Sequence, residues 1–120
     1  MGLFRKPQAH WFAPPLTGEH VTLTYLGTAG FVLQNQERTV VLDPFLSRPG
    51  LLRTLFGRLV VDEERVRRLI PKADDVLIGH AHYDHILDAP ALCQQTGARL
   101  IGSRAAMMVG RAAGVQEQQL

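Results

Sequence analysis

The chain has 120 residues, of which 46% are hydrophobic and 20% charged, and its net charge is +2. This length and composition are typical of one globular domain with a hydrophobic core of its own. The basic residues are scattered along the chain rather than massed, which argues against a nucleic-acid-binding role based on charge.

The cysteine count and the lack of a long apolar run indicate the cellular location. Cys93 is the single cysteine, so no intrachain disulfide can form, and its place in a predicted helix makes it a small core residue. No apolar run approaches the roughly 20 residues that span a bilayer, and the N-terminus lacks a signal-peptide pattern. We therefore expect a cytoplasmic location and no membrane span.

The first part of the chain differs from the rest. Residues 1–20 are rich in proline and aromatic residues, and we expect an irregular N-terminal arm there. His10 and His20 lie in this arm and are interpreted as ordinary surface histidines. Residues 21–120 are expected to form the folded domain.

Three strands are predicted at the start of this domain. Residues 21–25 alternate apolar and polar side chains, which is typical of a half-buried strand. A glycine-bracketed turn separates them from a second apolar run that begins at Phe31, and a polar turn leads into residues 38–42. The pattern predicts an antiparallel meander, which Asp43 and Pro44 end.

A segment with many apolar side chains follows. Residues 45–61 contain seven leucines and phenylalanines together with Pro49 and Gly50, and we expect a mobile, partly helical segment. It could shape a substrate pocket, or it could dock a partner. Asp62 is then expected to cap a helix that Pro71 stops.

The remainder alternates strands and helices. After a strand over residues 75–79, Asp88 is expected to cap a helix that runs to Gly97. A strand over residues 98–102 follows, and Ser103 is expected to cap a last helix in which Met107 and Met108 fill the core. Strand, helix and strand in this order predict a parallel pair with a right-handed crossover.

The most informative residues follow the strand at 75–79. Four side chains that can bind a metal lie within six positions: His80, His82, Asp84 and His85. Residues two apart in extended backbone point to the same side, so His80 and His82 can converge on one ion. A turn at Tyr83 would direct Asp84 and His85 to a second point nearby. Imidazole and carboxylate groups suit zinc, and two ions about 3.5–4 Å apart could activate a shared water.

The run from His80 to His85 reads H-A-H-Y-D-H and resembles the H-x-H-x-D-H signature of the metallo-β-lactamase-fold hydrolases. Residues 24–31 and 41–44 resemble the opening β-hairpin of that superfamily. Within it, they are most similar to the branch of ascorbate-phosphate lactonases and N-acyl-phosphatidylethanolamine phospholipases D. The resemblance implies an α/β fold, the N-terminal half of an αββα sandwich: an antiparallel meander, then strand-helix-strand-helix.

The resemblance also implies roles for individual residues. His80 and His82 would bind the first ion, and Asp84 with His85 the second, the cofactor being one or two Zn²⁺ ions with Mn²⁺ or Fe as alternatives. Asp84 would in addition act as a catalytic residue that orients a metal-activated hydroxide. Asp43 would support the site or only cap a turn, and Tyr83 would line the pocket or only pack. The substrate would be a small molecule with an ester, lactone, phosphodiester or amide bond.

The resembling family completes its metal site with further histidines and an aspartate downstream. This chain has no histidine after His85 and no aspartate after Asp88, so it offers two ligands per ion. Three explanations stay open: a fragment of a longer hydrolase, a half-domain completed by a second chain, or a small protein that binds metal weakly. An alternative function is a non-catalytic binding or assembly module with a vestigial metal cluster. Half of a two-sheet domain would also leave one apolar sheet face uncovered.

Overall fold

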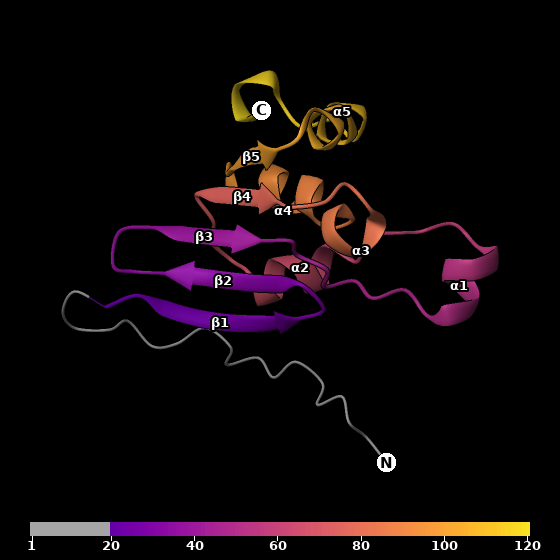
Figure 1. The fold of residues 1–120 in the computed structure, drawn as a ribbon, viewed down its shortest axis with the longest axis horizontal. Helices are drawn as coiled ribbons and strands as arrows, with labels where there is room; N and C mark the ends of the chain where they lie inside the picture. Colours follow the sequence, from indigo (N-terminus) through magenta and orange to yellow (C-terminus); the bar gives the residue numbers. More distant parts are fainter. Residues whose placement is uncertain (1–19) are drawn as a thin grey trace, which may run out of the picture.

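A five-stranded mixed sheet in the order β1-β2-β3-β4-β5 is the centre of the computed structural model, which describes residues 20–120 (Figure 1). The expected N-terminal arm lies outside the described residues, apart from His20 at its end, which is exposed. The α/β class predicted from the sequence is confirmed. No helix within the described range is long and apolar enough to cross a bilayer.

The first three strands form the predicted antiparallel meander. They are β1 (Thr22–Gly27), β2 (Gly30–Gln34) and β3 (Thr39–Leu42), each antiparallel to the next. The turn between β2 and β3 is closed by Asn35, whose Oδ1 accepts hydrogen bonds from the backbone N–H groups of Glu37 and Arg38 at 3.0 and 2.6 Å. Such local bonding is why asparagine favours turns.

The last two strands join the sheet in parallel. β4 (Asp75–Ile78) pairs with β3, and β5 (Arg99–Gly102) pairs with β4. The predicted parallel pair is therefore confirmed. Because parallel neighbours end at the same edge, the residues that follow β3 and β4 meet there.

Five α-helices lie within residues 20–120, four of them between strands and the fifth after β5. They are α1 (Leu51–Phe56), α2 (Glu63–Leu69), α3 (Tyr83–Ile86), α4 (Ala89–Thr96) and α5 (Arg104–Ala112), and a 3₁₀ turn covers Glu117–Gln119. Two predicted caps are confirmed, because the side chains of Asp62 and Ser103 accept hydrogen bonds from Arg65 N and Ala106 N.

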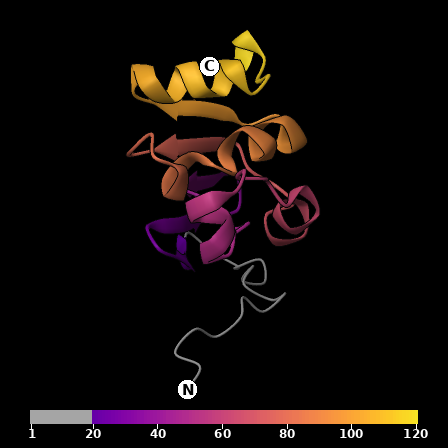
Figure 2. The ribbon, with the colours of Figure 1, turned by 90° about the vertical axis from the view of Figure 1, so that its right-hand side faces the viewer.

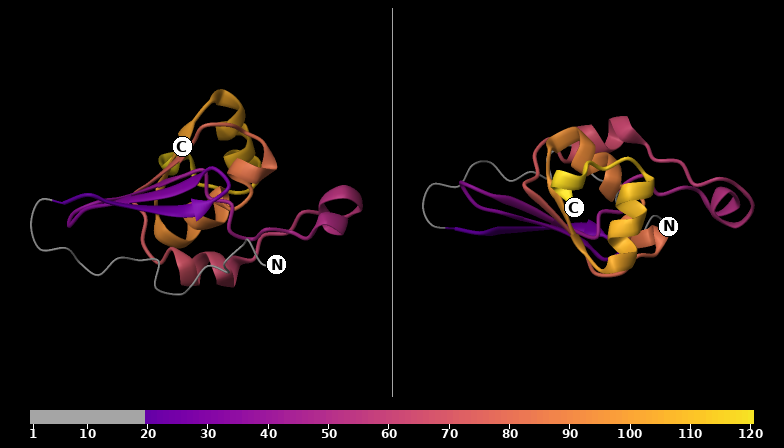
Figure 3. Two further views of the ribbon diagram at one scale, coloured as in Figure 1. Left: turned by 60° about the horizontal axis from the view of Figure 1, so that its bottom comes forward. Right: turned by 90° about the horizontal axis from the view of Figure 1, so that it is seen from above.

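The hydrophobic core lies on one face of the sheet. One row of the register runs across four strands and consists of fully buried apolar side chains: Val32, Val41, Val76 and Leu100. Val66 of α2, Leu92 of α4 and Ala106 of α5 pack in the same cluster. The views in Figure 3 accordingly place these three helices on one side of the sheet.

The opposite face of the sheet is apolar and largely uncovered by the described residues. A second row of the register crosses all five strands: Tyr25, Phe31, Leu42, Leu77 and Ile101. Its two end members are exposed and the other three are only half-buried. The expectation of an uncovered apolar face is confirmed, and we call this set the open row.

Two expectations about single side chains were wrong. The carboxylate of Asp88 makes no hydrogen bond to the start of α4, because it is turned inward to other donors. Met108 is exposed rather than part of the core, whereas Met107 does pack against it. The apolar stripe of α5 is narrow, so consecutive residues cannot both face the sheet.

Cys93 is a buried free thiol in α4, as predicted. Burial raises the pKa of this thiol to about 12, because the thiolate would lose its hydration. We expect alkylation by iodoacetamide at mildly alkaline pH to be at least about 100-fold slower in the folded chain than in urea, since the thiolate is the nucleophile. Mass spectrometry of the labelled chain measures this rate, and equal rates in the two states would contradict the burial.

Candidate metal centre

The four predicted ligands lie at the carboxyl end of β4, beside the carboxyl end of β3. In Figure 1 both strands point toward α3, and Figure 2 looks onto this end of the sheet. His80 and His82 occupy the connection after β4, while Asp84 and His85 belong to α3. The parallel pairing of β3 and β4 therefore brings Asp43, which follows β3, to the same place.

The three histidine rings gather at this edge. The ring centroids of His80 and His82 are 3.9 Å apart, and those of His80 and His85 are 5.5 Å apart. His82 has extended backbone, and its carbonyl accepts hydrogen bonds from the N–H groups of His85 and Ile86, both at 3.0 Å. The one-turn helix α3 stands where the sequence predicted a turn at Tyr83, and it carries His85 back toward His80.

The second pair of predicted ligands is also adjacent. His85 Nε2 lies 3.7 Å from Asp84 Oδ2, and the Asp84 side chain is about one-third exposed. The structure thus groups the four side chains as a histidine pair and a histidine–aspartate pair. Within residues 20–120, however, no three His, Cys, Asp or Glu side chains are arranged to hold one ion.

Asp43 is fixed between the two strands. Its Oδ1 accepts a hydrogen bond from Gly79 N at 2.7 Å, and its own N–H donates to Leu77 O at 2.9 Å. A Cβ at position 79 would lie 3.1 Å from Asp43 Oδ2, so glycine permits this close approach. Asp43 adopts a φ of 41°, which is uncommon for a residue with a side chain.

Asp43 also faces His85. Its Oδ2 is 3.2 Å from His85 Nδ1, but the two atoms are not aligned as a hydrogen bond, so this buried nitrogen has no hydrogen-bond partner among residues 20–120. A carboxylate at this place favours a proton on Nδ1 and leaves the lone pair of Nε2 for a metal. The imidazole and carboxylate donors fit a divalent ion by type, although those within residues 20–120 are too few to enclose one.

Sequence reasoning missed the role of Asp88. Its carboxylate is buried and accepts hydrogen bonds from Leu46 N at 2.5 Å, from Ser47 N at 2.8 Å and from the Ser47 hydroxyl. Ser47 Oγ in turn accepts from Asp62 N at 2.7 Å. These bonds fasten both ends of the segment that carries α1 beside α3. The bonds of Asp88 link residues 41 or 42 positions apart, so no local signal in the sequence revealed them.

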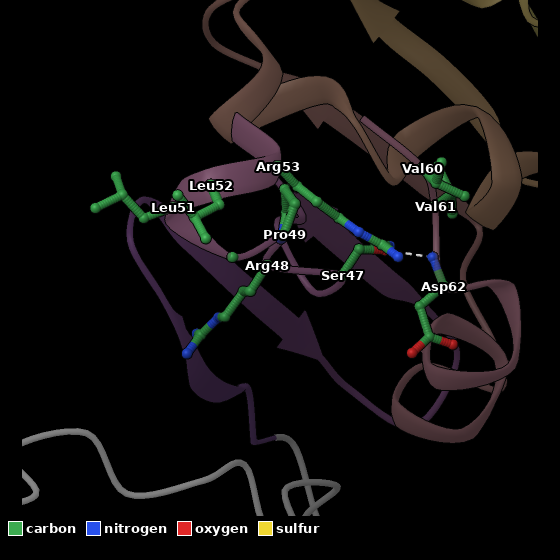
Figure 4. Close-up of a pocket in the computed structure, with 10 residues that line it drawn as sticks. Ser47, Arg48, Pro49, Leu51, Leu52, Arg53, Val60, Val61 and Asp62 are labelled. Atoms are coloured by element: carbon green, nitrogen blue, oxygen red, sulfur yellow. Dashed lines mark hydrogen bonds between the residues drawn. The ribbon is translucent and has the colours of Figure 1, made fainter. Parts of the chain in front are cut away.

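The segment from Phe45 to Val61 borders the histidine cluster. The rings of Phe45 and Tyr83 are in edge contact, with centroids 5.9 Å apart, so Tyr83 packs at the base of this segment. A cavity of about 650 Å³ lies between α1 and the start of α2, lined by Ser47, Arg53, Val61 and their neighbours (Figure 4). Its size is typical of a small-molecule pocket.

Comparison with known proteins places this geometry in a family. The family model described as the metallo-beta-lactamase superfamily matches residues 23–119. The chain belongs to the metallo-β-lactamase superfamily. The resemblance read from the histidine cluster is thereby confirmed at the level of the superfamily.

Two relatives of this superfamily member are both described as UPF0173 metal-dependent hydrolases. One, from Anaeromyxobacter dehalogenans, is 38% identical over 80 residues, which are 66% of this chain and 26% of the relative. Another, from Methanopyrus kandleri, is 36% identical over 80 residues, or 67% of this chain and 30% of the relative. The matched segment thus spans less than a third of the length of either relative.

A solved structure is also similar. Igni18, described as a metallo hydrolase from the hyperthermophilic archaeon Ignicoccus hospitalis, matches with a TM-score of 0.57 and 28% sequence identity. The match covers 80% of this chain and 37% of that protein. The sheet and its helices therefore correspond to part of a metallo-hydrolase fold.

Proposed function

We propose that residues 21–120 are the ligand-bearing half of a metal-dependent hydrolase. The observation that carries the proposal is the convergence of three histidines and an aspartate at the joint edge of β3 and β4, in a chain of this superfamily. His80 and His82 would hold one ion, and Asp84 with His85 a second. Zinc is the proposed metal, with manganese or iron as alternatives.

The bound metal would supply Lewis acidity that lowers the pKa of a water. The chain's own residues would orient the reactants. Asp43, whose carboxylate faces His85 Nδ1, would orient that ring, and Asp84, which is partly exposed, would hold a proton of the attacking water. The cavity beside α1 would receive a small molecule with an ester, lactone, phosphodiester or amide bond.

The site needs ligands beyond the described residues. Two donors per ion fall short of the three or four protein ligands usual for zinc, so the rest would come from a continuation of the chain or from a second chain. The open row supports the same view, because a second β-layer would bury it. The proposed location of the protein is the cytoplasm, as expected from the sequence.

Metal content per chain tests the proposal, with mass and oligomeric state determined on the same preparation after exposure to zinc. We expect near-stoichiometric zinc in an assembly that hydrolyses model esters or phosphodiesters. His82→Ala should weaken zinc binding by about 100-fold. Replacing a residue that only supports a metal ligand already lowers metal affinity by about 10- to 100-fold, and His82 is a proposed ligand itself. The matched control is His20→Ala, which replaces an exposed histidine and should leave zinc content and hydrolysis unchanged.

The alternative is a non-catalytic binding module. The absence of any three-ligand arrangement among residues 20–120 favours it for this chain on its own. An oligomer that stays metal-free in zinc, with no hydrolysis and no effect of His82→Ala, would support the module and refute the hydrolase.

A further inference from the structure

Helix α1 carries a dense group of exposed apolar side chains. Five large residues between positions 51 and 60 are more than half exposed: Leu51 at 73%, Leu52 at 76%, Leu55 at 61%, Phe56 at 86% and Val60 at 57%. None of the six residues of α1 is buried. We call residues 51–60 the α1 tip. A contiguous exposed apolar group of this kind is typical of a docking surface.

The α1 tip stands away from the body of the molecule on an anchored base. Figures 1 and 3 show α1 projecting beyond the sheet, at the end where α3 lies. The base is held because Asp88 binds Leu46 and Ser47, and Ser47 binds Asp62 N. Two hydrogen bonds close the helix itself, Thr54 N to Gly50 O and Gly57 N to Arg53 O. The apolar side chains are thus presented on an attached element.

The charge of the segment indicates what it could meet. Residues 44–61 contain three arginines and no acidic residue. Arg48 is engaged at the base, where it donates to Leu26 O. Arg53 and Arg58 belong to the tip and are exposed, and the Arg53 side chain extends along the cavity toward Asp62 (Figure 4). The exposed apolar and cationic side chains of the tip would be matched by a partner with an apolar interior and an anionic surface. An anionic lipid bilayer has this arrangement.

We propose that the α1 tip docks on the surface of an anionic lipid bilayer. Leu52 and Phe56 are four positions apart and share one face of α1, so both can enter the boundary between headgroups and acyl chains. Arg58 meets the lipid phosphates, and Arg53 reaches them by turning out of the cavity. A second copy of the chain fits less well, because two tips face to face would bring arginines of like charge together.

The site end of the molecule would then face the bilayer. Phe45, at the base of the segment, touches Tyr83 between the predicted ligands, so a docked tip holds the histidine cluster close to the lipid surface. This inference needs neither bound metal nor hydrolysis, and it goes beyond the proposed function.

Co-sedimentation with vesicles of phosphatidylcholine, with and without phosphatidylglycerol, tests the proposal. The wild-type chain should bind the vesicles that contain phosphatidylglycerol. The double variant L52S/F56S should bind them about tenfold or more weakly, since it loses two inserted side chains. The variant R53Q/R58Q should lose about tenfold, and with it the preference for phosphatidylglycerol.

The control is L23S/Y25S, which removes two exposed apolar side chains from the sheet face instead and should bind as the wild type does. Circular dichroism and the protection of Cys93 from alkylation confirm that each variant is folded. The proposal is overturned if the wild-type chain binds neither type of vesicle, or if L52S/F56S binds as strongly as the wild type. So does a concentration-dependent dimer that L52S/F56S abolishes without any effect of lipid.

Discussion

Replacing Asp88 by alanine is expected to lower the free energy of unfolding by about 3–5 kcal/mol. The buried carboxylate accepts from Leu46 N, Ser47 N and the Ser47 hydroxyl, and alanine leaves these donors without a partner. Each unsatisfied buried donor costs about 1–3 kcal/mol. Urea unfolding, followed by circular dichroism and by the exposure of Cys93 to alkylation, measures the change.

Asparagine at the same position separates hydrogen bonding from charge. Asp88→Asn retains one oxygen that can accept from both backbone N–H groups, so we expect a loss of only about 1 kcal/mol. Asp62→Ala is the matched control, since it removes an exposed cap of α2 and should also cost about 1 kcal/mol. Equal stability of Asp88→Ala and Asp62→Ala would refute the buried network.

Replacing Leu92 by alanine is expected to lower the free energy of unfolding by about 2–5 kcal/mol. Leu92 is fully buried in α4, in the core cluster that also contains Val76 of β4 and Val66 of α2. Alanine would lose transfer free energy and leave a cavity that the sheet and two helices cannot fill completely.

The matched control for this change is Leu52→Ala in α1, where the leucine side chain is exposed and should contribute within about 0.5 kcal/mol. The same urea titration serves for both variants, and the slope with denaturant should not change. A loss below about 1 kcal/mol at Leu92, similar to that at Leu52, would show that α4 is not packed on the sheet as described.

The elements that sequence reasoning located correctly are those with local causes. The meander follows from alternating side chains and from the Asn35 turn, and α2 begins where Asp62 can cap it. The buried strand at Asp75–Ile78 is a short apolar run between polar neighbours. Each of these signals lies within a few residues of the structure that it specifies.

What could not be predicted depends on contacts between distant residues. Asp88 looked like a helix cap, but donors more than 40 positions earlier compete successfully for its carboxylate. Asp75 lies between two strands that bring Arg38 and Arg99 to it, at 2.7 and 2.6 Å. The resemblance offered Asp43 as a supporting residue, but its position behind His85 depends on the pairing of β3 with β4, which composition and periodicity do not determine.

The predicted ligands were named from spacing alone, and the structure adds how they are turned. The two-residue step from His80 to His82 does bring the rings together, as extended backbone requires. The return of His85 toward His80 depends on the one-turn helix α3. The carbonyl of His82 accepts the first hydrogen bonds of this helix. A helix of one turn is too short to produce a recognisable pattern in the sequence.

The unusual φ of Asp43 has a consequence for the histidine cluster. A left-handed backbone at a residue with a side chain costs about 1–3 kcal/mol, and it persists only where neighbouring bonds enforce it. Here those bonds come from Leu77 and Gly79 of the adjacent strand and its extension. The sheet therefore holds Asp43 in this conformation, and any weakening of the β3–β4 pairing would release Asp43 from its place beside His85. Loosening would then start at the histidines before the core opens.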